Sequence, residues 1–189
     1  MKNITILASG SGTNAENIIR FFGNKDEGKV ILLLSNRKDA YALERAKKLG
    51  VAAEVFSRED LSSNGRVLSI LKDNKTDLII LAGFLWLIPE DIIQAFPNRI
   101  INIHPALLPD YGGKGMYGMR VHQAVIDNCE EKSGISIHLV NEEYDRGEII
   151  FQAECPVLPE DSPETLAARI HELEYKHFPE VILEYLDKL

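Results

Sequence analysis

Short apolar runs alternate with amphipathic stretches through the first hundred residues, and this alternation constrains the fold more than any other feature. Runs typical of strands lie at 3–9, 29–35, 52–57, 77–84 and 99–104. Stretches with helical spacing lie between them, at 13–22, 40–50, 64–74 and 89–96. Strands that are apolar at nearly every position are buried on both faces, as in parallel sheets covered by helices. The pattern predicts an α/β fold with a doubly wound, mostly parallel sheet.

The pattern changes after Pro105. A helix, two strands and a long final helix are predicted at 119–128, 133–140, 149–157 and 162–189. The two strands are separated by a short polar turn, so we expect a hairpin that extends the sheet by antiparallel pairing. Ser162 and Pro163 suit the N-cap and first turn of the last helix. The expected fold is therefore Rossmann-like, with an antiparallel extension and a long C-terminal helix that closes it.

Composition limits the class of protein. The chain of 189 residues is long enough for one domain with a substantial core. A formal charge of −8 without a Lys/Arg cluster argues against nucleic acid as a partner. No apolar run approaches the roughly 20 residues of a membrane span, and the N-terminus lacks a signal-peptide pattern. Cys129 and Cys155 are isolated, so we expect reduced thiols in a cytoplasmic protein that binds no membrane.

The stretch SGSGTN (9–14) joins the first strand to the first helix. Ligands of open α/β sheets lie at the carboxyl ends of strands, where a glycine loop and a helix N-terminus favour a phosphate. A phosphate site is thus the favoured interpretation, and a plain tight turn is the alternative. Gly10, Gly12 and Ala15 also fit a loose dinucleotide pattern. The second strand ends in Ser-Asn-Arg (35–37), without the acid expected for NAD, whereas NADP stays open.

Asn102 and His104 share one face at the carboxyl end of the fifth strand. An amide beside an imidazole can hold a carbonyl oxygen and move a proton, although a locally hydrogen-bonded histidine is the alternative. Asp145 lies in the turn between the last two strands, and spacing alone does not bring it near His104. AGFLWLIP (82–89) is either core or the wall of a cleft for a flat ligand. The other histidines are too scattered in sequence for a metal site, so no metal is expected.

Four stretches together resemble the phosphoribosylglycinamide formyltransferases, the 10-formyltetrahydrofolate-dependent enzymes of purine synthesis. They are GSGTN at 10–14, AGFLWLIP at 82–89, NIHPALLP at 102–109 and EEYDRGEII at 142–150. The last two mark the wider formyltransferase superfamily, and the glycine loop narrows it to the branch with a phosphorylated small substrate. The resemblance covers essentially the whole chain, in order.

The resemblance implies a reaction and a role for each motif. The formyl group of 10-formyltetrahydrofolate would pass to the glycyl amine of N1-(5-phosphoribosyl)glycinamide, with Asn102 stabilising the oxyanion, His104 donating a proton and Asp145 raising the pKa of His104. The residues implied to bind the ribonucleotide are Gly10, Ser11, Gly12, Thr13, Asn14, His171 and Glu174. Those implied for the folate are Arg58, Leu85, Trp86, Leu87, Ile88, Asn102, Asn141, Glu142, Glu143, Tyr144 and Asp145.

The resemblance further implies one formyltransferase domain over 1–189. Its phosphate-binding half would be 1–100, and its catalytic and folate-binding half would be 101–189. The expected partners are the two small-molecule substrates, and the expected assembly is a monomer or a weak homodimer.

Two departures from the family pattern stand out. The loop at 110–120 is several residues longer than in many members, which leaves the roles of Lys114 and Tyr117 open. Trp86 stands where many members carry an arginine, which bears on affinity for the folate.

Other classes of protein are alternatives. A methionyl-tRNA formyltransferase would add an RNA-binding domain and a basic surface, and a formyltetrahydrofolate hydrolase would add a regulatory domain before the catalytic one. We expect neither for a chain of this length and charge. An NADP-binding reductase would leave Asn102, His104 and Asp145 without a role. A non-enzymatic nucleotide-binding module would bind phosphate without turnover.

Overall fold

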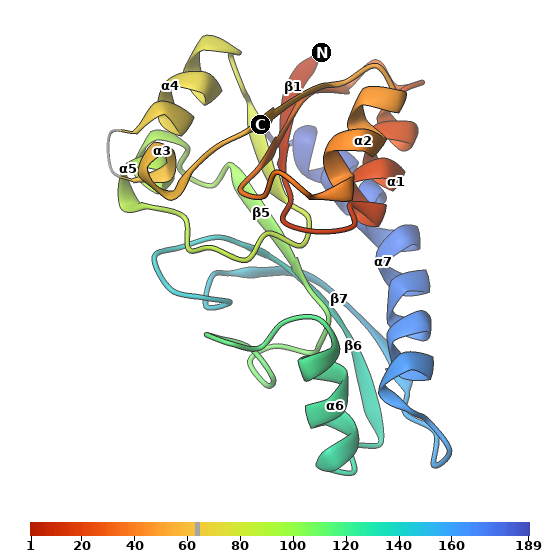
Figure 1. Ribbon diagram of the computed structural model, residues 1–189. Helices are drawn as coiled ribbons and strands as arrows, with labels where there is room; N and C mark the ends of the chain where they lie inside the picture. The colour runs from red at the N-terminus through yellow and green to blue at the C-terminus, as the bar shows by residue number, and fades with distance from the viewer. Residues whose placement is uncertain (63–64) are drawn as a thin grey trace.

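The computed structural model describes residues 1–62 and 65–189, and the strands among them form one sheet (Figure 1). The strands are β1 (Lys2–Leu7), β2 (Gly28–Ser35), β3 (Ala52–Val55), β4 (Leu78–Leu81), β5 (Ile100–His104), β6 (Lys132–Leu139) and β7 (Ile149–Pro156). Their order is β3-β2-β1-β4-β5-β6-β7. The first five pair in parallel, while β6 and β7 add antiparallel pairing. The predicted fold class is confirmed.

Helices cover both faces of this sheet (Figure 1). They are α1 (Thr13–Phe22), α2 (Tyr41–Lys48), α3 (Arg58–Leu61), α4 (Arg66–Asp73), α5 (Glu90–Ala95), α6 (Met119–Asp127) and α7 (Pro163–Leu186). One apolar cluster joins α1, α2 and α7 to the sheet, and a second joins α3, α4 and α5 to its other face. In β4, Ile80 belongs to the first cluster and Ile79 to the second, which explains why these strands are apolar at every position.

Two differences from the predicted elements have simple causes. The helix α3 was not predicted because its single turn is too short to show a helical period, although Ser57 and Asp60 form a capping box at its start. The predicted helix over 64–74 corresponds to α4, and its first predicted residue, Asn64, lies outside the described residues. No helix in the described ranges combines the length and the apolar character needed to cross a membrane.

The strand order creates the place where a ligand can bind. After β1 the chain crosses to β2 on one side, and after β4 it crosses to β5 on the other side. The two connections diverge, which leaves a crevice at the carboxyl ends of β1 and β4. Two hydrogen bonds link the chains there: the Ser9 amide donates to the Gly83 carbonyl at 3.1 Å, and the Leu85 amide donates to the Ser9 hydroxyl at 3.1 Å. The glycine loop and the AGFLWLIP stretch are thereby held side by side.

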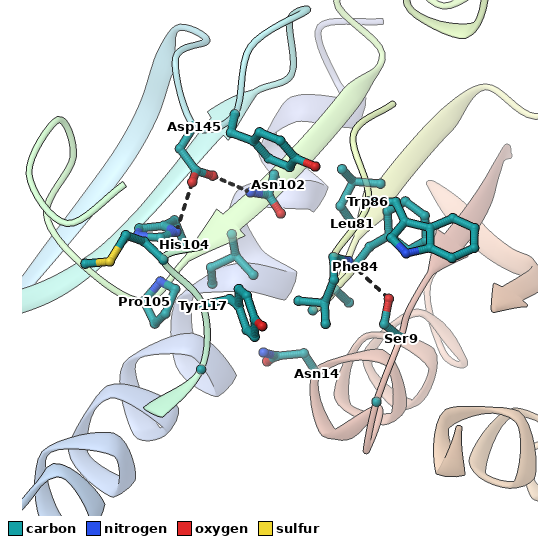
Figure 2. A pocket seen from close by; sticks show the side chains of 18 of the residues that line it. Ser9, Asn14, Leu81, Phe84, Trp86, Asn102, His104, Pro105, Tyr117 and Asp145 are labelled. Atoms are coloured by element: carbon teal, nitrogen blue, oxygen red, sulfur yellow. Dashed lines mark hydrogen bonds and ion pairs between the residues drawn. The ribbon is translucent and has the colours of Figure 1, made fainter. Parts of the chain in front are cut away.

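Antiparallel pairing of β5 with β6 brings a second set of polar residues to the same edge. Asn102 lies opposite His138, and His104 lies opposite Ser136. Opposite residues of a strand pair point to the same face of the sheet, so His138 accompanies Asn102. The turn after β6 then returns over these side chains with Asp145 (Figure 2).

The C-terminal helix α7 packs beside α1 on the same face of the sheet and covers the part of that face over β6 and β7 (Figure 1). The predicted N-cap is confirmed, because the Ser162 hydroxyl accepts from the Thr165 amide and Pro163 follows it. Phe178 is fully buried in the core. It lies one turn after Glu174 on the same face of the helix, so its packing fixes the position of that carboxylate.

Truncating Phe178 tests this anchoring. We expect Phe178→Ala to lower the free energy of unfolding by about 3–5 kcal/mol, because a fully buried ring leaves a cavity. Urea denaturation followed by circular dichroism measures the change. Tyr175→Ala on the same helix, where the ring is 39% exposed, should cost less than about 1 kcal/mol. Equal losses for the two variants would contradict this account of α7.

Candidate active site

A cavity of about 660 Å³ opens along the carboxyl edge of β1, β4 and β5. Its walls come from the glycine loop, the 82–88 stretch, the end of β5, the loop before α6, the turn after β6 and helix α7. This volume is in the range of small-molecule sites, and segments far apart in the chain contribute to it. Figure 2 shows its lining: Asp145, Asn102 and His104 lie at one side, and Ser9 and Asn14 lie across from them.

The Asp145 carboxylate is the centre of the polar side. Asn102 donates its side-chain amide to Oδ1 at 3.3 Å, and the Gly113 backbone amide donates to Oδ2 at 2.9 Å. The His104 Nδ1 lies 3.6 Å from Oδ2, and the His138 Nε2 lies 3.5 Å from Oδ1. Burial raises the pKa of the Asp145 carboxyl, but its hydrogen bonds and the neighbouring imidazoles lower it more, so the net pKa is below its usual value. The carboxylate is therefore charged at neutral pH.

His104 is buried with both ring nitrogens near acceptors. Its Nε2 donates to the Tyr111 carbonyl at 2.7 Å, and its Nδ1 faces the Asp145 carboxylate. These acceptors favour the imidazolium, whereas desolvation by burial disfavours it and is the larger effect. The pKa of His104 is consequently lower than its ordinary value. Asp145 acts on the pKa of His104 in the expected direction, but desolvation by burial outweighs its effect.

His138 is the polar residue of this group that the sequence analysis missed. Its Nδ1 donates to the Leu139 carbonyl at 2.7 Å, which leaves Nε2 to accept from the Asn102 amide at 3.0 Å. Asn102 is thus held by two acceptors, His138 and Asp145, so that its carbonyl and amide directions are set. Alternation along β6 shows which face His138 is on. It indicates the site only once the antiparallel register places His138 opposite Asn102.

An apolar wall lies beside the polar group. Leu81, Phe84 and Trp86 enter the cavity from the end of β4 (Figure 2), and Ile88 and Val140 extend the wall. The Phe84 and Trp86 rings meet edge to face at 6.5 Å between centroids. A wall of this kind suits a flat aromatic ligand.

The glycine loop forms the opposite end of the cavity. Gly12 precedes α1 with a left-handed backbone (φ 73°), and an added Cβ there would lie 2.5 Å from Ala42 of α2. The residue must therefore be glycine for the fold. Gly10 has open space around its Cα. The first amide groups of α1 have no carbonyl partner within the helix, so they can donate to an anion.

Helix α7 adds a carboxylate to this end. Glu174 is buried, and its Oε2 accepts from the Asn14 side chain at 2.9 Å and from His171 Nδ1 at 2.8 Å. The hydrogen bond that His171 donates to Glu174 raises the pKa of His171. Two buried atoms in the described part of the chain lack a protein hydrogen-bond partner here, Asn14 Oδ1 and His122 Nδ1. Both residues line the cavity, so a ligand can supply the missing partners.

Comparison with known proteins identifies this arrangement. Residues 2–182 match the model of a family described as formyl transferase. The chain belongs to the formyl transferase family.

Three relatives make the similarity more specific. A phosphoribosylglycinamide formyltransferase of Haemophilus influenzae is 40% identical over 187 residues, covering 96% of this chain and 86% of its own. The chloroplastic phosphoribosylglycinamide formyltransferase of Arabidopsis thaliana is 41% identical over 96% of this chain, which spans only 64% of that relative's length. The crystal structure of glycinamide ribonucleotide transformylase 1 from Symbiobacterium toebii is 35% identical, with a TM-score of 0.90, and covers 100% of this chain and 89% of that one. The resemblance found in the four motifs is confirmed.

Most of the predicted site residues of this formyltransferase line the one cavity. They are Gly10, Ser11, Gly12, Thr13, Asn14, Leu85, Trp86, Leu87, Ile88, Asn102, His104, Glu143, Tyr144, Asp145, His171 and Glu174. Three predicted residues are not in its lining: Arg58, Asn141 and Glu142. Arg58 lies behind the wall, with its guanidinium 5.4 Å from the centre of the Trp86 ring. Within the described ranges, no group of three or more His, Cys, Asp or Glu side chains is arranged to hold a metal ion.

Replacing Asp145 with Asn tests the electrostatics of this site. We expect the pKa of His104 to fall further, because the variant loses the charge that favours the imidazolium while burial still disfavours it. Titration of the His104 ring signals by NMR measures the shift. The ring signals of His171, whose pKa is raised by its hydrogen bond to Glu174, serve as the internal control and should keep that pKa. A His104 pKa that is the same in both proteins would mean that the two residues are not coupled.

Proposed function

We propose that this formyltransferase transfers the formyl group of 10-formyltetrahydrofolate to the glycyl amine of N1-(5-phosphoribosyl)glycinamide in purine biosynthesis. One observation carries the proposal: a single cavity joins an anion-binding glycine loop to the Asn102, His104 and Asp145 group, with an apolar wall beside both. The names of the relatives support formyl transfer to the same ribonucleotide.

The ribonucleotide spans the two polar ends of the cavity. Its phosphate lies on the amides of the 10–14 loop, and its ribose meets Glu174 and His171, which are hydrogen-bonded to each other. The glycyl amine then reaches His104 at the end of β5. In this arrangement the phosphate needs few cations, because backbone amides and the dipole of α1 supply the positive potential.

The folate occupies the apolar side. Leu85 to Ile88 and the 143–145 turn hold the pterin, and Trp86 provides an aromatic face where the family pattern often has arginine. The glycine loop lies in the 1–100 half, and Asn102, His104 and Asp145 lie in the 101–189 half. The residues proposed to hold the pterin come from both halves.

The reaction requires alignment and the transfer of one proton. The amine nitrogen forms a bond to the formyl carbon, and the bond between that carbon and N10 of the folate breaks. The amine loses one proton and N10 gains one, so the products balance. An α-amino group has a pKa of roughly 8, so an appreciable neutral fraction exists at neutral pH and no protein nucleophile is needed.

Asn102 and His104 divide this work. The two N–H groups of Asn102 are held by His138 and Asp145 in the resting site, and one of them turns to donate to the oxyanion that forms at the formyl group. Because burial lowers the pKa of His104, its neutral ring accepts the amine proton first and then delivers it to N10. Asp145 stabilises the imidazolium formed between the two transfers. This order differs from the expectation in which His104 begins as a protonated donor.

One assay tests the function. Purified protein is incubated with glycinamide ribonucleotide and 10-formyltetrahydrofolate, and the products are weighed by mass spectrometry. Formylated ribonucleotide is the expected product. Folate deformylation that proceeds equally well without the ribonucleotide would instead identify a hydrolase, and an absence of turnover with retained phosphate binding would identify a non-enzymatic binding module.

The glycine loop can be tested at Gly10. We expect Gly10→Val to raise the KM for the ribonucleotide at least tenfold and to leave the KM for the folate nearly unchanged, because the new side chain enters open space in the cavity. Gly12→Val is unsuitable, since it would collide with Ala42 and disturb the fold. Steady-state kinetics with each substrate varied gives the two constants. An unaltered ribonucleotide KM in a protein with normal thermal stability would exclude the loop as the phosphate site.

The coupling of His104 and Asp145 can be tested by a double-mutant cycle. His104→Asn and Asp145→Asn should each lower kcat by about 10²–10⁴-fold, as expected for lost proton-transfer catalysis. The double variant should be little worse than either single one, because the two residues act as one unit. Rapid-quench kinetics with saturating substrates measures the chemical step. If the double variant loses the full product of two independent factors, the residues do not share one role.

A further inference from the structure

The loop between β5 and α6 is fastened to the catalytic residues at its first half. The Tyr111 carbonyl accepts from His104 Nε2, and the Gly113 amide donates to Asp145 Oδ2. Gly112 lies between them, where an added Cβ would come within 2.5 Å of Leu108 Cδ2 and 3.2 Å of Asp145 Cβ. These two hydrogen bonds fix the position of the loop backbone relative to His104 and Asp145.

The second half of the same loop carries an aromatic side chain into the cavity. Gly113 (φ 95°) and Gly118 (φ 55°) flank it with positive φ values, which allow the backbone to reverse on both sides of Tyr117. Tyr117 lines the cavity and keeps 44% of its surface exposed. In Figure 2 its ring lies between Pro105 and Asn14, away from the apolar wall of Phe84 and Trp86.

Two cationic residues lie three positions from Tyr117 in the chain, Lys114 before it and Arg120 after it. The Arg120 guanidinium lies 5.1 Å from the centre of the Tyr117 ring, a distance at which a cation is attracted to the aromatic face. Lys114 also lines the cavity from this loop. Lys114 and Arg120 thus add positive charge to a lining that also holds the carboxylates of Glu143, Asp145 and Glu174.

We infer that Tyr117 is a binding residue for the ribonucleotide, with its ring against the ribose and its hydroxyl hydrogen-bonded to the same substrate. This assignment rests on the proposed function, because it needs the phosphate on the 10–14 loop and the amine at His104. A substrate held at those two ends passes between Asn14 and Pro105, where the Tyr117 ring lies. The long loop thus adds a contact to one of the two substrates, and the folate does not share it.

Two substitutions separate the ring from the hydroxyl. Tyr117→Phe should raise the KM for the ribonucleotide about fivefold, as for one lost neutral hydrogen bond. Tyr117→Ala should raise it about 30-fold or more, because the ring contact is lost as well. Neither should alter the KM for the folate by more than about twofold. Since Tyr117 is largely exposed, both variants should keep the thermal stability of the parent protein.

Tyr41 provides a matched control. Its ring is 49% exposed and lies 4.9 Å from the Arg45 guanidinium, so it has the same exposure and the same kind of cation contact as Tyr117. It does not line the cavity. Tyr41→Ala should therefore leave both KM values unchanged.

Binding of each substrate can also be measured without turnover. The single tryptophan, Trp86, lies in the apolar wall, so its fluorescence reports binding at the wall where the folate is proposed to lie. Calorimetric titration reports ribonucleotide binding. Weaker ribonucleotide binding with an unchanged folate signal in Tyr117→Ala supports the assignment. If the parent protein formylates the ribonucleotide but Tyr117→Ala binds it normally, the assignment is wrong; if the parent protein does not formylate it, the proposed function itself is wrong.

Discussion

The buried carboxylate of Asp145 is the interaction on which the site depends. It is 11% exposed, and a charge at such a position is costly unless donors surround it. Its partners come from β5, from β6 and from the loop before α6, so three segments must meet correctly before the charge is satisfied. The same contacts orient the Asn102 amide and favour the charged form of His104. Satisfying one carboxylate thus assembles the groups that the chemistry needs.

The antiparallel strand β6 makes this assembly possible within a sheet that is otherwise parallel. Because β6 runs antiparallel to β5, it places His138 opposite Asn102, and the turn after β6 folds back over these side chains with Asp145. Gly147 lets this turn close, because a Cβ there would lie 1.7 Å from the Leu139 carbonyl oxygen. The crevice between β1 and β4 then provides the substrate space beside the polar group.

The sequence predicted the local features, namely the strands and the face on which a side chain lies. It left open the contacts that depend on how distant strands pair. Apolar runs were sufficient for the first five strands, and the polar turn between two further runs was sufficient for the last two. Alternation was sufficient to place Asn102 and His104 on one face. Asp145 is 41 positions from His104 in the chain, so only the family resemblance brought it to the site. His138 was missed because its position needed the register of β6. The lowered pKa of His104 depends on burial, which no motif expresses.

The two ends of the cavity differ in what they demand of a ligand. Asn14 Oδ1 and His122 Nδ1 are buried among the described residues without protein partners, and leaving such atoms unsatisfied costs about 1–3 kcal/mol each. A ligand with hydroxyl groups relieves this cost, whereas an apolar analogue of the same shape does not. In the proposed binding mode, these two polar atoms favour a ribonucleotide over an analogue that lacks its hydroxyl groups. Among the described residues, the wall around Trp86 has no buried polar side-chain atom without a partner, so it selects its ligand by shape and apolar contact.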